Sequence, residues 1–191
     1  MKHKFLLTTG LAVLLAACAS TTPPSSPDNM CDILQEKPSW REALEKSRER
    51  WGAPPQIVLS IIYQESSFKH DAKPPKDYLL WIIPWGRISS AYGYPQAKDE
   101  VWGEYKEQTG RSFASRDDFE DAADFVGWYM DKAQKINRTS KWDAYSQYLN
   151  YHEGWYGFQR HTYANKTWLK NTAAKVRTRA ERYGAQYMSC R

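Results

Sequence analysis

The segment Pro54–Phe68 limits what this chain can fold into more than any other stretch. Two prolines suit the start of a helix, and four β-branched residues then recur at helical spacing, so that one face must be buried: Ile57, Val58, Ile61 and Ile62. Glu65 lies three and four residues after Ile62 and Ile61 and shares their face. We therefore expect a buried helix whose last turn carries a carboxylate where a hydrophobic side chain is usual.

Two interpretations of Glu65 follow from this position. In the first, burial and the negative end of the helix dipole raise its pKa, and a carboxyl group that stays protonated near neutral pH suits a general acid. In the second, the side chain reaches the rim of the protein and pairs with an arginine. This helix alone does not separate the two.

The first 17 residues have the pattern of a secretory signal, with two lysines, an apolar run from Phe5 to Leu15 and two alanines before Cys18. The run is too short to span a membrane. Its end, Leu-Ala-Ala-Cys, also has the spacing of a bacterial lipobox, in which the cysteine is acylated and becomes the mature N-terminus. Lipid on Cys18 and the absence of Asp at position 19 predict an anchor on the periplasmic face of the outer membrane of a Gram-negative bacterium. The alternative is plain signal cleavage beside an unmodified cysteine.

Residues 18–30 are rich in Ser, Thr and Pro, so we expect a lipidated flexible tether there and one folded domain over residues 31–191. Cys31 and Cys190 stand at the two ends of that domain. Export to an oxidising compartment predicts a disulfide between them, and two free buried thiols are the alternative. Removal of Lys2 and Lys4 lowers the net charge from +5 to +3, which gives no reason to expect nucleic-acid binding.

The domain has helical patterns almost throughout, which predicts a mainly α fold. Ser39 and Glu42 have the spacing of a capping box for a helix that runs to Trp51. A later apolar stripe predicts a core helix: Phe119, Ala122, Ala123, Val126, Tyr129 and Met130. Three further helices are expected. One ends near Gln108, a second runs over residues 141–151, and a third runs over residues 165–182.

Prolines interrupt the helical pattern between about residues 70 and 90, where we expect a small irregular or β-hairpin region. Its apolar run Tyr78–Trp85 has three interpretations, in this order: a buried strand or hairpin, a lid over a cleft, or a patch that touches lipid. From Arg160 to Arg191 the chain has eight basic residues against Glu181 alone. Such a run indicates a solvated face, or a contact with anionic polymer or lipid headgroups.

The sequence does not contain the motifs that are typical of metal-dependent enzymes, serine hydrolases or nucleotide-binding proteins. The histidines His70, His152 and His161 do not have metal-ligand spacing, and the chain has neither a Gly-x-Ser-x-Gly elbow nor a phosphate-binding loop. We expect neither a metal nor a cofactor.

Three motifs follow one another along the chain: Glu65-Ser66-Ser67-Phe68, Gly93-Tyr94-Pro95-Gln96 and Asn150-Tyr151-His152-Glu153-Gly154. In this order they resemble the signature of the lytic transglycosylase (SLT domain) and goose-type lysozyme superfamily, which reads Glu-Ser-x-Phe, Gly-x-x-Gln and Ala-Tyr-Asn-x-Gly. The resemblance spans about residues 37–182 and implies a lysozyme-like helical domain. His152 stands where the family usually has Asn, and Tyr94-Pro95 replace the more common Leu-Met, so the resemblance does not define the outline of the sugar subsites.

The resemblance implies cleavage of the β-1,4 bond between N-acetylmuramic acid and N-acetylglucosamine in peptidoglycan, with a 1,6-anhydro product and Glu65 as the single acid and base. Ser66 would hydrogen-bond near the acid. The side chains that would contact the substrate are Ser66, Tyr92, Gln96, Tyr151, His152 and Glu153. The family also has a tyrosine on its last helix near the acid, for which Tyr163 and Trp168 are the candidates here.

Two other functions stay open at this point. The first is a lipoprotein without catalysis that keeps the fold to hold glycan strands or to dock an envelope complex; His152 favours it, whereas the costly carboxylate of Glu65 favours the enzyme. The second is a lysozyme-type hydrolase, in which water attacks with the help of a second carboxylate. Glu153 and Asp143 are the candidates for that group, although the glycines near Glu153 suggest an exposed side chain.

Overall fold

The computed structural model describes residues 21–79, 83–87 and 89–190. The expected signal sequence and Cys18 lie outside the described residues. The described chain is mainly helical, as expected, and has these elements: α1 (Met30–Glu36), α2 (Pro38–Trp51), α3 (Pro55–Ser66), β1 (Lys76–Leu79), β2 (Ile83–Arg87), α4 (Asp99–Thr109), α5 (Phe119–Asn137), α6 (Ala144–Glu153), α7 (Trp155–Gln159) and α8 (Thr167–Cys190). In this part of the chain no helix is both long enough and apolar enough to cross a bilayer.

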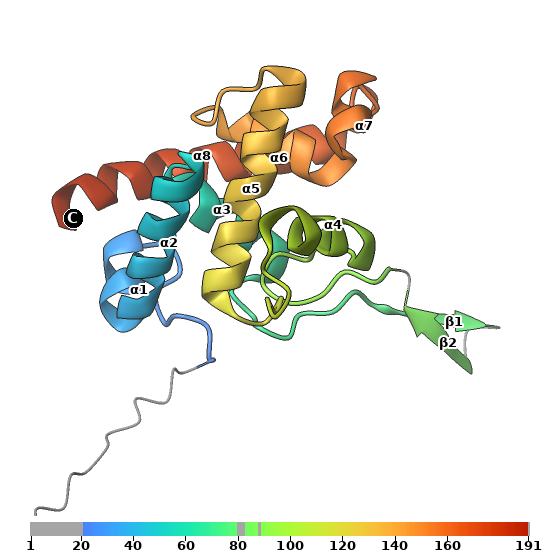
Figure 1. The fold of residues 1–191 in the computed structure, drawn as a ribbon, viewed down its shortest axis with the longest axis horizontal. Coiled ribbons are helices and arrows are strands. Elements are labelled where there is room, and N and C mark those ends of the chain that lie inside the picture. Colours follow the sequence, from blue (N-terminus) through green and yellow to red (C-terminus); the bar gives the residue numbers. More distant parts are fainter. Residues whose placement is uncertain (1–20, 80–82, 88, 191) are drawn as a thin grey trace, which may run out of the picture.

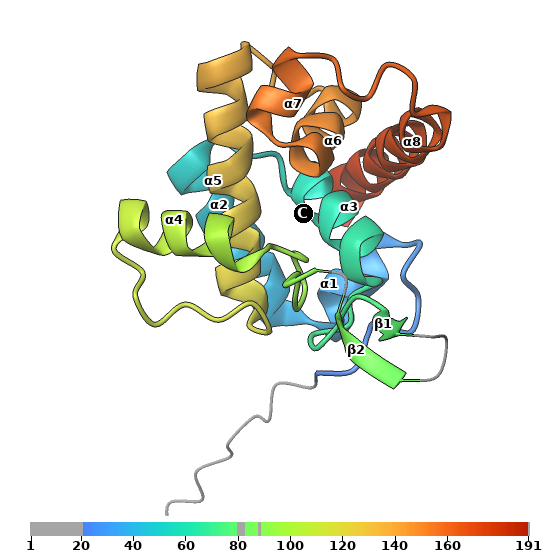
Figure 2. The same cartoon turned by 90° about the vertical axis from the view of Figure 1, so that its right-hand side faces the viewer.

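Helix α5 runs through the middle of the domain, with α2 and α3 packed against it (Figures 1 and 2). The apolar stripe predicted for this helix is buried along its length. The hydroxyl group of Ser47 in α2 donates a hydrogen bond to the carbonyl of Ala123, at 2.8 Å, where the two helices meet. Helix α8 packs across α3 and α6 and closes the other side of the core.

The start of α2 differs from the prediction. The helix begins at Pro38, and Lys37 occupies the N-cap position without a side-chain capping bond. Ser39 and Glu42 lie inside the helix, so the predicted capping box was wrong. A proline is favoured at the first helical position because it needs no N–H partner and its φ is already helical, and here this preference outweighs that of Ser39 for the cap.

The region between residues 70 and 90 contains the predicted hairpin. Strands β1 and β2 pair antiparallel, with Lys76 opposite Arg87 and Leu79 opposite Ile83, and the register shifts between Asp77 and Tyr78. The hairpin extends away from the helical body (Figures 1 and 2). The interpretations of the run as a lid or a lipid contact stay untested.

The two ends of the domain are joined covalently, as predicted. Cys31 and Cys190 form a disulfide with their Cα atoms 5.8 Å apart. Helix α8 continues beyond the predicted end at residue 182 to reach this bridge.

Residues 24–30 do not form the free tether that we expected. Pro24 is buried, and the carboxylate of Asp28 pairs with Arg179 at 2.7 Å and Arg182 at 2.6 Å. The hydroxyl group of Tyr183 donates a hydrogen bond to the carbonyl of Pro27. We call residues 24–30 the N-terminal strap, because these contacts bind the segment to α8.

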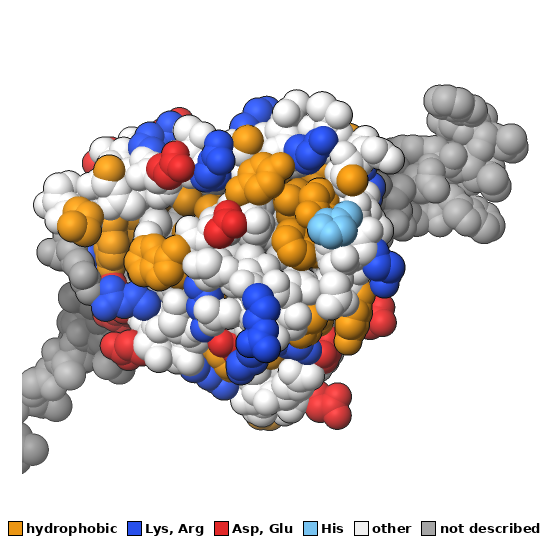
Figure 3. Space-filling model, turned by 90° about the horizontal axis from the view of Figure 1, so that it is seen from above, with side chains coloured by type: hydrophobic (Ala, Val, Ile, Leu, Met, Phe, Trp, Pro, Cys, Tyr) orange, Lys and Arg blue, Asp and Glu red, His pale blue; other side chains and the backbone are white. Residues whose placement is uncertain are grey.

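The end of the molecule where α5 finishes and α7 lies is shown in Figure 3. Hydrophobic side chains are exposed there between lysine and arginine side chains. Two exposed aromatic residues belong to the loop after α5 and to α7, namely Trp142 and Tyr156.

Candidate active site

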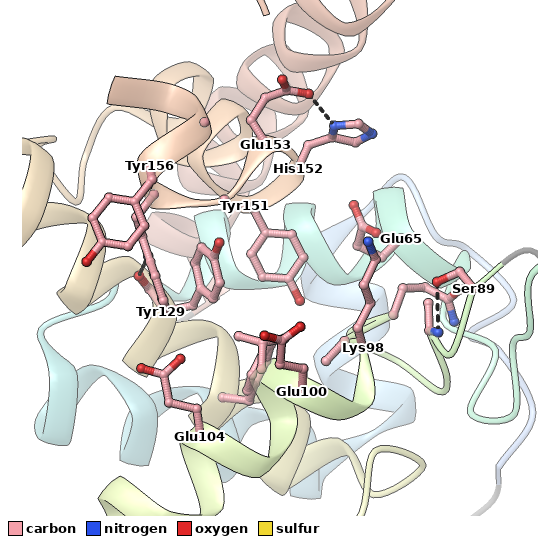
Figure 4. Close-up of a pocket in the computed structure, with 18 of the residues that line it drawn as sticks. Glu65, Ser89, Lys98, Glu100, Glu104, Tyr129, Tyr151, His152, Glu153 and Tyr156 are labelled. Carbon is pink, nitrogen blue, oxygen red and sulfur yellow. Dashed lines mark hydrogen bonds and ion pairs between the residues drawn. The ribbon is translucent and has the colours of Figure 1, made fainter. Parts of the chain in front are cut away.

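A groove of about 660 Å³ opens between α3, α4, α5 and the turn from α6 to α7 (Figure 4). All three sequence motifs contribute to its wall. The groove is lined by Glu65, Pro74, Ser89, Ala91, Gln96, Ala97, Lys98, Glu100, Val101, Glu104, Phe125, Tyr129, Tyr151, His152, Glu153, Gly154, Trp155, Tyr156, Gly157 and Arg160.

Glu65 stands in the last turn of α3 and points into this groove (Figure 4). Burial raises the pKa of its carboxyl group to about 7, and a hydrogen bond with Tyr148 acts in the opposite direction. Among the described residues Glu65 has no ion pair, so the interpretation of a rim carboxylate held by an arginine was wrong. A protonated and a charged form of Glu65 are therefore both accessible near neutral pH.

The end of α3 is fixed by the motif that contains Glu65. Ser67 and Phe68 both have left-handed backbone conformations, with φ of 51° and 62°, which stop the helix directly after Ser66. The ring of Phe68 is fully buried against Trp40 and Tyr63, with centroid distances of 5.3 Å and 5.2 Å. The phenylalanine of the motif thus anchors the turn that carries the acid.

Ser66 does not reach the groove. Its side chain is buried, and its hydroxyl group donates a hydrogen bond to the carbonyl of Ile62 at 3.1 Å, one turn back in α3. The structure therefore gives Ser66 a local role in the helix and no place among the groove-lining residues.

Tyr151 lies beside Glu65 and spans the groove from α6 to the second motif. Its hydroxyl group donates a hydrogen bond to the carbonyl of Pro95 at 2.6 Å. Its ring packs against Tyr129, with centroids 4.9 Å apart, and the hydroxyl group of Tyr129 donates to the carbonyl of Asn150 at 3.1 Å. Burial raises the pKa of Tyr151 well above its usual value, and the nearby charge of Glu65 raises it further. The hydroxyl group of Tyr151 therefore stays protonated.

The second motif is a tight turn that places Gln96 in the groove wall. Gly93 has φ of 72°, and a Cβ there would lie 2.1 Å from the carbonyl oxygen of Arg116, so only glycine fits. The side-chain nitrogen of Gln96 donates hydrogen bonds to the carbonyls of Ala72 (2.9 Å) and Gly93 (2.8 Å). Its amide oxygen remains the group that could accept a bond from a ligand.

The side-chain contacts of Tyr92 are with residues outside the groove lining. Its hydroxyl group donates to a carboxylate oxygen of Asp117 at 3.3 Å, and the cations of Lys73 and Arg116 lie 5.3 and 5.5 Å from the centre of its ring. It is absent from the groove lining, so the structure does not bring it together with the other predicted contact residues.

The third motif places His152 and Glu153 at the upper wall of the groove. One ring nitrogen of His152 lies 3.0 Å from the Glu153 carboxylate, which points away from Glu65 (Figure 4). Lys166 contacts both carboxylate oxygens of Glu153 at 2.8 and 2.9 Å, and Thr162 donates a further hydrogen bond. Burial alone would raise the pKa of Glu153, but the bonds from Lys166, Thr162 and His152 lower it to about 2.

We compared the chain with models of known protein families. Residues 6–190 match the family model described as the transglycosylase SLT domain. The chain belongs to this family. Comparison with curated proteins and with solved structures finds no match.

Membership of the transglycosylase SLT domain family agrees with the helical fold and implies peptidoglycan as the substrate. Domains of this family act on peptidoglycan in the periplasm.

A tyrosine that the sequence analysis did not select makes a direct contact with the acid. Tyr148, in α6, makes a hydrogen bond with Glu65. The two sequence candidates lie elsewhere: Trp168 is exposed with its ring edge toward His152, and Tyr163 stacks on Phe158. Neither Tyr163 nor Trp168 is part of the groove lining, so the structure does not bring them together with Glu65. The only sequence signal for Tyr148 is its place one helical turn before Tyr151.

The structure also changes which residues of this SLT domain are candidates for a second carboxylate in the groove. Asp143 caps α6 by accepting a hydrogen bond from the backbone of Ser146 at 3.1 Å, and it is not part of the groove lining. The side chain of Glu153 is only 4% exposed, which corrects the expectation of an exposed residue. The groove does contain two carboxylates that the sequence analysis missed, Glu100 and Glu104 of α4, and Glu104 pairs with Lys132.

The residues that the structure describes contain no cluster of three or more His, Cys, Asp or Glu side chains that could hold a metal ion.

Proposed function

We propose that this protein is a lytic transglycosylase that cleaves the β-1,4 bond between N-acetylmuramic acid and N-acetylglucosamine, with Glu65 as its single acid and base. The observation that carries the proposal is the Glu65 carboxyl group, which is buried in a groove with a pKa of about 7. A group with this pKa can give up a proton and take one back at the same pH. A protein that only holds glycan strands would have no use for it.

In the first step, the protonated carboxyl group of Glu65 donates its proton to the glycosidic oxygen while the bond from that oxygen to C1 of the muramic sugar breaks. The N-acetylglucosamine part leaves with a new hydroxyl group. Positive charge develops at C1, and the N-acetyl group of the same muramic sugar stabilises it. Glu65 is now a carboxylate.

In the second step, the C6 hydroxyl group of the muramic sugar attacks C1 as Glu65 takes its proton. This closes the 1,6-anhydro ring and restores protonated Glu65, so water is not consumed. This scheme departs from that of most glycosidases, which need two carboxylates.

The surrounding side chains support this scheme by position. Tyr148 bonds to Glu65 and would orient the carboxyl group between the leaving oxygen and the C6 hydroxyl. Tyr151 forms the adjoining wall, and the amide oxygen of Gln96 would accept a hydrogen bond from a sugar hydroxyl or N-acetyl group. His152 and Tyr156 would contact sugar rings farther along the groove.

The arrangement of Glu153 argues against this residue as the second carboxylate of a hydrolase. A hydrolase needs a second carboxylate that can activate water or stabilise charge across from the acid. Glu153 is held by Lys166, Thr162 and His152 and points away from Glu65, so it does not suit that role.

The test is mass spectrometry of the muropeptides that purified peptidoglycan releases when treated with residues 21–191, which retain the strap and the disulfide. Glu65→Gln is the control. We expect anhydro-muramic products from the unchanged domain and none from the variant. Products with reducing ends would instead assign a hydrolase, and Glu100 would be the next carboxylate to replace. Binding to peptidoglycan without release of products would assign a binding protein without catalysis.

We also propose that Cys18 carries lipid and holds the domain on the periplasmic face of the outer membrane. The support is the lipobox spacing of residues 15–18. In cells fed a labelled fatty acid, label should appear in the natural protein and be absent from Cys18→Ala. Label of equal intensity in both would overturn this assignment.

A further inference from the structure

A second pocket lies at the opposite ends of the two helices that carry the active site. Its volume is about 250 Å³, and it is lined by Gln56, Ile57, Trp142, Asp143, Ala144, Arg177, Ala180, Glu181 and Gly184. Helices α3 and α6 both begin at this pocket and end at the groove. Gln56 and Glu65 are nine residues apart in α3, so about 14 Å of helix separates the two sites. We call this site the tryptophan pocket.

Trp142 is the most unusual residue of this pocket. Its side chain is 72% exposed, although a large aromatic ring in a folded domain is normally buried. The ring therefore offers a broad apolar face at the surface, next to a hollow.

The loop that carries Trp142 is held firmly by hydrogen bonds. The backbone N–H of Trp142 donates to the hydroxyl oxygen of Ser140 at 3.2 Å, and the next N–H donates to the carbonyl of Ser140 at 3.1 Å. The side-chain nitrogen of Gln147 donates to the carbonyls of Thr139 and Ser140 at 3.3 and 3.2 Å. Lys141 binds both Asp131 and the carbonyl of Trp51. The exposed ring is thus presented by an ordered loop, which lowers the entropy cost of binding.

Besides Trp142, the tryptophan pocket has four polar side chains and three apolar ones, and the polar ones are Gln56, Asp143, Arg177 and Glu181. Arg177 and Glu181 stand one turn apart on α8 with their charged groups 3.8 Å apart, and Gln56 extends from the first turn of α3. Guanidinium, carboxylate and amide groups are the donors and acceptors that bind hydroxyl and N-acetyl groups. A flat aromatic face beside such groups matches a pyranose ring, which has C–H bonds on one face and hydroxyl groups around its edge.

Gly184 gives independent support, because packing does not explain a glycine at this point of α8. A Cβ at Gly184 would meet only side-chain atoms of Gln56, at 3.5 to 3.8 Å, which is ordinary contact. Glycine inside a helix lowers its stability relative to alanine. The absent side chain leaves the floor of the tryptophan pocket open.

We propose that the tryptophan pocket binds one N-acetylated sugar ring of peptidoglycan outside the catalytic groove, with the ring stacked on Trp142. The volume is below the roughly 300–1,000 Å³ of pockets that enclose drug-sized ligands, so it suits a single ring. The identity of the polymer rests on the proposed function. The site itself does not depend on catalysis by Glu65.

The first test uses the Glu65→Gln form of residues 21–191, labelled with ¹⁵N, and the disaccharide of N-acetylglucosamine as the probe. The indole N–H signal of Trp142 is identified by its loss in Trp142→Phe. We expect a saturable shift of this signal, with a dose dependence separate from that of Trp155, which lines the groove. If the Trp155 signal shifts and the Trp142 signal does not, the sugar binds in the groove and not in the tryptophan pocket, which would overturn the proposal.

The second test measures how much of the same Glu65→Gln domain sediments with purified peptidoglycan. Trp142→Ala should weaken retention about three- to tenfold, the range expected for the loss of one stacking contact. Phe113→Ala is the matched control, because Phe113 is fully exposed and borders neither pocket. Equal retention of both variants would contradict the proposal.

A second pair of variants controls for folding. Gly184→Ala narrows the floor of the tryptophan pocket, whereas Gly103→Ala adds a Cβ to α4 in open space. Both should preserve the helical circular dichroism spectrum, and only Gly184→Ala should lower retention. If both variants lower retention equally, the loss comes from a change in helix stability, and the tryptophan pocket is not involved in binding. Because retention is measured without catalysis, failure of these tests is distinct from failure of the muropeptide test.

Discussion

Glu65 and Glu153 line the same groove but have opposite ionisation, because their contacts differ. Glu65 is buried without a cation, which raises its pKa to about 7. Glu153 is bound by Lys166, Thr162 and His152, and its pKa falls to about 2. The folded state therefore favours the protonated form of Glu65 and the charged form of Glu153. Each carboxylate affects stability in its own pH range.

Replacement of Glu65 by glutamine should stabilise the protein at alkaline pH. The folded pKa of Glu65, about 7, lies above its ordinary value of 4.5, so the native protein loses stability as pH rises from about 4.5 to 7. Glu65→Gln removes this loss, which amounts to at most about 3 kcal/mol. Urea unfolding should give equal stability for the two proteins near pH 4 and a more stable variant at pH 8. A less stable variant at pH 8 would show that the carboxylate is a structural partner.

Replacement of Tyr148 by phenylalanine should move the pH profile of activity. The hydrogen bond from Tyr148 lowers the pKa of Glu65, so its loss raises that pKa. The alkaline limb of the rate profile should shift to higher pH, and the maximal rate should fall about tenfold as the acid loses its orientation. Tyr163→Phe is the control, since Tyr163 bonds to His161. A lower rate with an unshifted alkaline limb would limit Tyr148 to packing.

At the scale of elements, the turn at Gly93 should be intolerant of a side chain. Gly93 and Gly110 both have positive φ, of 72° and 71°, but a Cβ meets the backbone of Arg116 only at Gly93. Gly93→Ala should cost more than about 2 kcal/mol and displace Gln96, whereas Gly110→Ala should cost about 1 kcal/mol. Thermal unfolding of the two variants tests this. Equal losses would mean that backbone strain alone decides the effect.

The helices that could be predicted from the sequence are those whose position is determined by residues close together along the chain. Prolines and apolar spacing define α3, and the stripe of α5 follows from periodicity. The partners of Glu65 could not be read in this way, because the contact with Tyr148 depends on how α6 crosses α3. Helix α8 was predicted to end near Arg182, yet it continues because the strap and the disulfide hold its last turns. Ser66 belongs to the first motif and Tyr92 directly precedes the second, but their hydrogen bonds to Ile62 and Asp117 hold them outside the groove lining.

At the scale of the whole molecule, the disulfide should stabilise the domain without being needed for its fold. It closes a loop of 159 residues, and the loss of such a bridge typically costs roughly 2–5 kcal/mol. Reduction should lower the melting temperature and leave the helical spectrum at 20 °C unchanged, because α3, α5 and α8 pack independently of it. Ser substitution of both cysteines should have the same effect. Loss of helix on reduction at 20 °C would contradict this prediction.

The N-terminal strap sets how far the enzyme could work from a membrane. Pro24 is already buried, so if Cys18 is lipidated, at most six residue steps separate the lipid from the folded body. Fully extended, they span about 20 Å. The groove would then be confined to glycan strands that lie close beneath the lipid surface, and lengthening the chain before Pro24 would extend its reach to deeper strands.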